Sequence, residues 1–413
     1  MKRCLVLLTT AYPYNPGEPY LETEMPYLAA RFGRILLLPI GIDPGAKVSV
    51  PLPENVTLCN SAVLPPKKAR LLDCLHGLSA VFRLPKLPER DLAEVKHSLP
   101  KRAFLGYFLA RTRRHTREIL DAVRDFDFSA YGEVVLYSYW FFVAAAVGAE
   151  LRKALPATKF ISRAHGYDLY PYANALDYLP CRTMLLQAVD GVYACSEDGK
   201  RFLTKQNPDF SDTIHCACLG TPEGTLTEGS VDGVFRILTC ARTVPLKRLD
   251  RLADALALLP DTAIEWTHIG DGASLPALRK KCAELHNVRF LGALSHEQVL
   301  DYYRKNPVDV FVNISKREGL PVSVMEALSY GVPAIVTDVG GCRELIDDGQ
   351  NGFLLPADFT DELLAQTLRK AHTCGRELRR NAFQKYQENF SAAQNFSRFA
   401  DLLCRADEGR TND

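Results

Sequence analysis

The sequence predicts an α/β protein made of two Rossmann-like domains, each with a parallel β-sheet between layers of helices. The first observation is the second half of the chain, where short β-branched or aromatic runs alternate with amphipathic stretches from Phe235 onward. Alternation at this spacing is typical of a parallel, doubly wound sheet. The second observation is length, because 413 residues exceed one ordinary core and indicate two or three domains.

The expected elements follow from these runs. In the second half, strands are expected at 235–240, 263–269, 288–291, 308–312, 333–337 and 352–355, and helices at 251–259, 275–285, 297–305, 325–330 and 363–371. In the noisier first half, strands are expected at 4–8, 35–40, 134–137, 159–162 and 191–194, and helices near 24–31, 141–153 and 198–203. A polar, Gly-rich stretch over 221–233 is the expected linker. We therefore expect domains over 1–225 and 226–390, and a last segment over 391–413.

Composition limits the possible partners and location. The chain is 47% hydrophobic and 24% charged, as in folded proteins, and its net charge of +1 gives no indication of a nucleic-acid partner. The apolar run over 4–8 is too short for a signal peptide, and no run reaches the length of a membrane span. The 12 cysteines lack the spacing of zinc ligands. We therefore expect a cytoplasmic protein without a bound metal.

Residues 66–117 depart from the strand–helix pattern. Basic residues far outnumber acidic ones there, and apolar side chains are interleaved at Phe104, Leu105, Tyr107, Phe108 and Leu109. Such a helical stretch can lie on an anionic membrane surface. It can equally be a solvated helical face with a stripe toward the core, and the sequence leaves both alternatives open.

The strongest chemical motif runs from Glu318 to Glu326 and follows an expected strand. Gly319 and Pro321 predict a tight turn into a helix that begins near Val322, with Leu320 between them. Free backbone N–H groups at a helix start, with the helix dipole, suit a diphosphate or sugar hydroxyls. Each glutamate can accept hydrogen bonds from hydroxyl groups. Two solvated acids without a ligand remain the alternative.

Two weaker motifs accompany it in the second half. Arg242 and Lys247 follow the strand expected at 235–240, where a bidentate guanidinium and an ammonium group could hold two phosphates. Gly270 lies in a Gly-rich turn after the strand expected at 263–269. Either motif alone could be an ordinary surface loop.

The first half offers candidates at the ends of its strands. His165 follows the strand at 159–162, and Asp168 comes three residues later. Tyr139 follows the strand at 134–137. A long loop after the first strand contains Gly17, which permits close backbone approach to a ligand, and Glu18.

Together these motifs resemble the family 4 glycosyltransferases, which have the GT-B fold. The resemblance covers nearly the whole chain and is most specific over 235–356. It implies two domains facing across a cleft, a C-terminal helix that crosses back to the first domain, and retaining sugar transfer without a metal. The co-substrate would be a UDP- or GDP-sugar, with no other cofactor. Residues 137–140, 165–170 and 196–199 are similar to a subgroup that builds bacterial exopolysaccharides, whose acceptor is a glycan or lipid-linked oligosaccharide at the inner face of the cell membrane.

The resemblance also implies roles for the candidate residues. Arg242 and Lys247 would hold the donor diphosphate, Glu326 the ribose hydroxyls and Glu318 the transferred sugar. The backbone of Gly319, Leu320, Pro321 and Val322 would contact sugar and phosphate, and His165 would lie beside the anomeric carbon. Gly17 and Gly270 are further donor-side candidates, and Glu18, Tyr139 and Asp168 are acceptor-side candidates. Many relatives have a Gly-Gly pair where Gly17 stands alone, which weakens the expectation for that loop.

Two other functions stay open. A nucleotide-sugar epimerase shares the two-domain plan, and a catalytically silent GT-B subunit could support a partner transferase. A silent subunit is expected to lose Glu318, Lys247 or His165, and all three are present. An oxidoreductase is disfavoured because no G-x-G-x-x-G motif follows the first strand.

Overall fold

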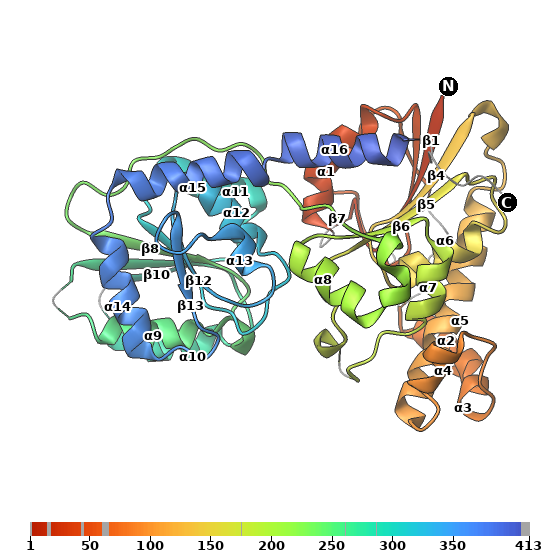
Figure 1. Cartoon of the computed structure of the whole chain (residues 1–413), viewed down its shortest axis with the longest axis horizontal. Helices are drawn as coiled ribbons and strands as arrows, with labels where there is room; N and C mark the ends of the chain where they lie inside the picture. Colours follow the sequence, from red (N-terminus) through yellow and green to blue (C-terminus); the bar gives the residue numbers. More distant parts are fainter. Residues whose placement is uncertain are drawn as a thin grey trace. The chain divides into compact units, whose positions relative to one another are not determined.

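The computed structural model describes residues 2–14, 18–42, 45–59, 66–174, 176–260, 262–285 and 287–405. The chain forms two compact units, one of Met1–Ala217 with Phe396–Asp413 and the other of Cys218–Asn395. Each unit is an α/β domain with its own parallel sheet and its own core (Figure 1). Within the described ranges, no helix has the length and apolar character needed to cross a membrane.

The first unit contains a seven-stranded sheet in the order β3-β2-β1-β4-β5-β6-β7. The strands are β1 Arg3–Thr9, β2 Arg34–Pro39, β3 Val56–Leu58, β4 Glu133–Ser138, β5 Lys159–Ala164, β6 Gly191–Ala194 and β7 Ile214–Cys216. All neighbours are parallel, and Leu5 of β1 pairs with Ile35 on one side and Val135 on the other. Helices cover both faces of such a sheet, which explains why its strands are nearly continuous apolar runs.

The helices of the first unit form two layers around this sheet. They are α1 Pro19–Ala29, α2 Pro66–Gly77, α3 Ser79–Phe82, α4 Glu89–Ala93, α5 Leu99–Ala122, α6 Val143–Leu151, α7 Arg182–Ala188, α8 Glu197–Gln206 and the end of α16 Ala392–Cys404. Phe399, Ala400 and Leu403 of α16 are buried in the same core as β1 and α1. The last helix therefore completes the first unit, although it comes after the whole second unit in the sequence.

The second unit contains a six-stranded parallel sheet in the order β10-β9-β8-β11-β12-β13. The strands are β8 Phe235–Cys240, β9 Ile264–Ile269, β10 Val288–Gly292, β11 Val310–Asn313, β12 Ala334–Thr337 and β13 Gly352–Leu355. The helices are α9 Leu249–Ala257, α10 Leu275–Lys281, α11 His296–Lys305, α12 Val322–Ser329, α13 Cys342–Leu345, α14 Asp361–His372 and α15 Arg376–Asn389. Strand order reverses between β8 and β11, and ligands of doubly wound folds bind beside the carboxyl ends of strands at such a point.

The fold class predicted from the sequence, with two parallel Rossmann-like sheets, is confirmed, but the division of the chain differs from the expected boundaries. The chain passes between units at 217/218 and 395/396 rather than at 225/226 and 390/391. Residues of the expected interdomain linker pack on the second unit, because Thr227 N donates to Tyr330 O over 3.1 Å and Arg379 donates to both Thr227 oxygens. The C-terminal helix that the resemblance implies is α16, which begins at Ala392 and follows the separate helix α15.

The apolar residues interleaved in α5, within the basic segment 66–117, do not form an exposed face. Leu105 and Phe108 of α5 are buried, and the ring of Phe104 packs edge-on against Tyr178 at 6.3 Å. These side chains belong to the core of the first unit, so the alternative of a stripe toward the core is confirmed for α5.

A buried ion pair joins α1 to β5 in the first unit. Arg163 Nη1 lies 2.8 Å from Glu24 Oε2, and neither side chain is exposed. Tyr137 donates a hydrogen bond of 3.1 Å to the other Glu24 oxygen, and the guanidinium of Arg163 lies 4.2 Å from the ring centroid of Phe399. Burial raises the pKa of Glu24, and Arg163 opposes this shift. The pair thus connects α1, the sheet and α16.

Candidate active site

The loops after β8 and β11 bring two of the predicted residues into contact. Lys247 follows β8 and Glu318 follows β11, and Lys247 Nζ lies 2.6 Å from Glu318 Oε1. Both side chains are partly exposed. The contact arises because β8 and β11 are neighbours at the point where strand order reverses. A cation and a carboxylate therefore meet where this fold class binds its ligands.

Arg248 fastens these two loops together. Its guanidinium donates to the carbonyl oxygens of Ile314 at 2.6 Å, Ser315 at 3.0 Å and Ala357 at 2.7 Å. Its backbone is left-handed, with φ 51°, and it is the residue before α9. The role of Arg248 could not be predicted from the sequence, because nothing in its neighbourhood distinguishes an arginine that binds carbonyl groups from an exposed one.

Glu318 is held on both its side chain and its backbone. Asn313 donates a hydrogen bond of 3.2 Å to Glu318 Oε1, and Ser315 donates to the Asn313 side-chain oxygen over 2.6 Å. Gly340 has φ +54°, and a Cβ there would lie 2.0 Å from the Glu318 carbonyl oxygen. Only glycine fits this close approach, so the loop after β12, which contains Gly340, fixes the turn that carries Glu318.

Helix α12 begins at Val322, after Pro321 in the N-cap position, and no side chain caps it. The start of this helix follows directly from Glu318 and Gly319. Uncapped N–H groups and the helix dipole favour an anionic or hydroxyl ligand at this end. The predicted turn at Gly319–Val322 is therefore present, although α12 is shorter than average.

Glu326 lies in the second turn of α12 and is buried. Its Oε1 lies 2.9 Å from Nε2 of His296, the first residue of α11. Burial raises the pKa of Cys240, at the end of β8, to about 12, and nearby Glu326 adds to the shift while Lys247 opposes it. Glu326 and Lys247 thus both lie near the end of β8. His296 could not be predicted as a site residue from the sequence, since one histidine at a helix start carries no recognisable pattern.

Arg242 and Gly270 complete the donor-side candidates on the second unit. The side chain of Arg242 is exposed and makes no ion pair or hydrogen bond with the described residues. Gly270 has φ +143°, and a Cβ there would lie 1.9 Å from the carbonyl oxygen of Ala241. Gly270 therefore serves to pack the turn after β9 against the loop that carries Arg242, rather than presenting a functional group. Among the donor-side candidates of the second unit, Arg242 is an exposed cation whose charge is not neutralised by a described residue.

His268 supports the same loop from inside the core. It is fully buried between two threonine hydroxyls, 2.9 Å from Thr239 Oγ1 and 2.9 Å from Thr243 Oγ1. Burial lowers the pKa of His268 to about 4. The neutral ring thus holds Thr243, which lies between Arg242 and Lys247.

The stability of the second unit should fall in mild acid because of His268. The unfolded chain protonates this histidine below about pH 6.5 while the folded chain keeps it neutral to about pH 4, so the unfolded state binds more protons in this window. Between pH 7 and 4.5 the wild type should lose roughly 2–3 kcal/mol more than His268→Gln. Denaturant unfolding followed through Trp266 fluorescence measures this, and equal losses in both proteins would contradict it.

On the first unit, the carboxylate of Glu18 binds backbone groups of its own loop. Its carboxylate accepts hydrogen bonds from the backbone N–H groups of Thr10 at 2.5 Å, Ala11 at 2.9 Å and Tyr12 at 2.5 Å, and from Trp140 Nε1 at 2.9 Å. Glu18 is buried, so it shapes the loop after β1. Gly17, the neighbouring donor-side candidate, lies outside the described residues.

Asp168 likewise joins two loops of the first unit. It is fully buried, and its two oxygens accept from the backbone N–H groups of His165 and Phe141, each at 2.8 Å. Asp168 and Glu18 were expected on the acceptor side, but in this structure both carboxylates are committed to backbone groups. They fix the loops after β1, β4 and β5 rather than facing solvent.

His165 is packed between aromatic rings, 4.7 Å from the ring centroid of Tyr139 and 4.4 Å from that of Trp140. Neither of its ring nitrogens has a hydrogen-bond partner in the described structure, since Nδ1 lies 3.8 Å from Asp168 Oδ2. Burial lowers the pKa of His165, but Cys195 and Asp168 outweigh burial and raise it. Tyr139 is fully buried, so it packs against His165 and does not present its hydroxyl at the surface.

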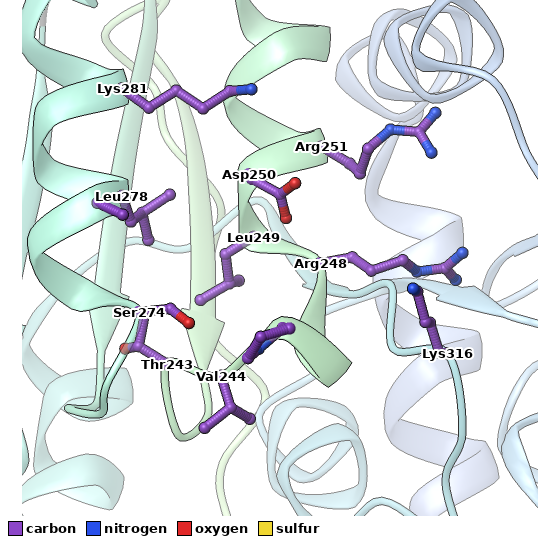
Figure 2. Close-up of a pocket in the computed structure, with 12 residues that line it drawn as sticks. Thr243, Val244, Arg248, Leu249, Asp250, Arg251, Ser274, Leu278, Lys281 and Lys316 are labelled. Carbon is purple, nitrogen blue, oxygen red and sulfur yellow. The ribbon is translucent and has the colours of Figure 1, made fainter.

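A cavity of ≈ 430 Å³ lies beside the loop after β8, between α9 and α10. Figure 2 shows Arg248 and Lys316 together on one side of it, with Thr243 and Ser274 near its base. None of Arg242, Lys247, Glu318 and Glu326 lines this cavity. It adjoins the predicted donor residues without containing them.

Comparison with known proteins decides the family. The model of the family described as "Glycosyl transferases group 1" matches residues 228–390. The putative glycosyltransferase EpsD of Bacillus subtilis is 33% identical over 275 residues, which cover 59% of this chain and 69% of EpsD. The chain belongs to the group 1 glycosyltransferases.

Other relatives of this group 1 glycosyltransferase match shorter stretches. The O-antigen biosynthesis glycosyltransferase WbnH of Escherichia coli is 35% identical over 121 residues, 29% of this chain and 33% of WbnH. The chain thus spans about a third of the first curated relatives that it matches. Among solved structures, Anabaena HepE in complex with UDP and glucose has a TM-score of 0.66 at 16% identity, covering 97% of this chain and 99% of HepE. Sucrose-phosphate synthase from Thermosynechococcus elongatus reaches 0.71 at 15% identity, covering 98% of both chains. These similarities confirm the fold.

Proposed function

We propose that this chain transfers a sugar from a UDP- or GDP-sugar to a hydroxyl of a glycan or lipid-linked oligosaccharide, with retention at the anomeric carbon and without a metal ion. The observation that carries this proposal is the Lys247–Glu318 pair beside the uncapped start of α12. A positive helix end with a nearby ammonium group suits a diphosphate, and a carboxylate beside them suits sugar hydroxyls.

The geometry of the second unit supports the donor roles that we propose for four of its residues. Lys247 and the exposed Arg242 bind the diphosphate, and the N–H groups at the start of α12 add hydrogen bonds to it. Glu318 orients the sugar, while Glu326 accepts hydrogen bonds from the ribose hydroxyls. His296 occupies only Oε1 of Glu326, which supports the ribose role because a second oxygen remains to accept.

In the transfer step, the bond between the anomeric carbon and the diphosphate oxygen breaks, and its electron pair stays on the diphosphate. The acceptor oxygen forms the new bond to that carbon and gives up its proton to the departing diphosphate oxygen. Charge that develops on the leaving diphosphate is stabilised by Arg242, Lys247 and the start of α12. His165 is the proposed catalytic residue of the first unit because its ring nitrogens are unbonded, with Tyr139 and Asp168 as positioning residues.

The names of the relatives support a role in bacterial surface polysaccharide synthesis. WbnH is named for O-antigen biosynthesis, and HepE was crystallised with UDP and with UDP-glucose. A UDP-sugar is therefore the first donor to test. Surface glycans of this kind are extended on acceptors made inside the cell, so we place the enzyme in the cytoplasm, at the inner face of the membrane when its acceptor carries a lipid.

The test is nucleotide-dependent thermal stabilisation, followed by product analysis. UDP, GDP and their sugars are added to the wild type. A ligand concentration of 100 times the dissociation constant should raise the free energy of unfolding by about 2.7 kcal/mol. Glu326→Ala should lose most of this gain in stability. His296→Ala should lose part of it, because the Glu326 carboxylate is then no longer held by the His296 ring. Glu297→Ala, at the exposed neighbouring position, is the control.

Two results would contradict the proposal. One is the absence of stabilisation by any nucleotide in the wild type, and the other is a full gain in Glu326→Ala. Product analysis separates the alternatives, because an epimerase converts the donor without an acceptor and a silent subunit converts nothing.

A further inference from the structure

Helix α2 packs against α5 through small and polar residues. Its buried positions are Ala69, Asp73 and Gly77, and a Cβ on Gly106 of α5 would lie 2.1 Å from the Gly77 carbonyl oxygen. Arg114 donates to both oxygens of Asp73, from Nε at 3.0 Å and from Nη2 at 2.8 Å. The inward face of α2 is thus built for close backbone approach and one ion pair, and it buries no large apolar side chain.

The large apolar residues of α2 and the following turn face outward instead. Leu71 is 61% exposed and Phe82 is 86% exposed. Leu71, Leu75, Leu78 and Phe82 recur at the spacing of one helical face, and Leu72 lies beside them. These five residues are called the leucine stripe. The arrangement is the reverse of an ordinary surface helix, and a continuous exposed apolar stripe indicates an interaction site rather than scattered surface residues.

Positive charges dominate around the leucine stripe, although Glu89, exposed at the start of α4, is acidic. The exposed charged residues from 67 to 88 are all basic, namely Lys67, Lys68, Arg70, Arg83 and Lys86. Asp73 is the sole acidic residue in this fully described stretch, and it is buried against Arg114. In Figure 1, α2, α3 and α4 lie together at one edge of the first unit.

We propose that the leucine stripe docks on an anionic lipid bilayer. The apolar side chains enter the boundary between headgroups and acyl chains, roughly 5–10 Å deep, while the surrounding lysines and arginines contact lipid phosphates. Charge complementarity selects this occupant, because two copies of the chain joined through the stripe would bring like charges together. Docking would bring the enzyme to a lipid-linked acceptor, so its purpose rests on the proposed function, but the binding itself does not.

Vesicle flotation tests the proposal. The full chain is mixed with vesicles of pure phosphatidylcholine, or with vesicles in which about one third of the lipid is phosphatidylglycerol. The bound fraction is measured at low and high salt. The wild type should bind the anionic vesicles and weaken as salt rises. Leu75→Ser with Phe82→Ser should lower the partition coefficient at least about ten-fold. Lys67→Gln, Lys68→Gln and Arg70→Gln together should remove the preference for anionic lipid.

Val231→Ser is the matched control, because Val231 is an even more exposed apolar residue on the second unit. Unchanged nucleotide stabilisation in the stripe variant shows that folding and donor binding are intact, which separates a failure of docking from a failure of the proposed function. Wild-type vesicle binding by the stripe variant would overturn the proposal. So would a dimer in light scattering that the same two substitutions dissociate, since a second copy would then occupy the stripe.

Discussion

Replacing Lys247 by alanine should lower kcat/KM for sugar transfer by about 30- to 900-fold, which corresponds to roughly 2–4 kcal/mol of transition-state stabilisation. The physical reason is the position of the Lys247 ammonium group. Lys247 lies in the loop after β8, and its Nζ is 2.6 Å from Oε1 of Glu318, which lies just before α12 in the sequence. Negative charge on the departing diphosphate grows in the transition state, so a cation here acts more strongly on the rate than on substrate binding.

The Lys247→Ala measurement needs a control for general loss of charge and for folding. Lys305→Ala removes an exposed ammonium at the end of α11, where it pairs only with Asp301, and should leave the rate unchanged. Lys247 is partly exposed, so its removal should shift the unfolding temperature little. Turnover by Lys247→Ala at the wild-type rate would remove the central support for the transferase mechanism.

Substituting Glu24 by glutamine should destabilise the first unit by about 3–5 kcal/mol, because it leaves the guanidinium of Arg163 buried without a counter-charge. Neither side chain is exposed, and an arginine cannot relieve the cost by losing its proton. Trp140 is the single tryptophan of the first unit, so its fluorescence in a Trp266→Phe background reports denaturant unfolding of this unit.

Two further variants make the Glu24 experiment decisive. Glu133→Gln removes the half-exposed pair with Arg3 in the same unit and should cost less than about 1 kcal/mol. The double variant Glu24→Leu with Arg163→Met should recover much of the lost stability, since apolar replacements of a buried pair leave no stranded charge. A Glu24→Gln protein as stable as Glu133→Gln would show that the buried pair does not hold α1 to the sheet.

The sheets could be predicted because they depend on local patterns, and so could the positions of Lys247 and Glu318 after their strands, although the contact between the two side chains was not predicted. Buried parallel strands such as β1 are nearly continuous apolar runs, and strand–helix alternation fixes a topology that brings the loops after β8 and β11 to one edge. The three-residue strands β3 and β7 escaped prediction because so short a run has no recognisable period.

Other features depend on tertiary contacts that no local pattern encodes. His296 meets Glu326 only because α11 packs beside α12, and Arg248 meets three carbonyl groups from later loops. The polarity of 221–233 predicted an interdomain linker, yet Thr227 and its neighbours bond to the second unit. In α2, an amphipathic pattern predicts that one face is apolar, but it does not predict which face has a partner. Here the small-residue face of α2 packs on α5, because Gly106 lets the two backbones approach closely at Gly77.

The return of α16 to the first unit has a consequence for synthesis on the ribosome. The core around β1 and α1 includes Phe399, Ala400 and Leu403, which are translated after the entire second unit. Domains generally fold in the order in which they emerge. Here β1 and α1 must wait until the second unit and α16 have been translated. Until then Phe399, the ring partner of Arg163, is missing, and an apolar surface is open to chaperones.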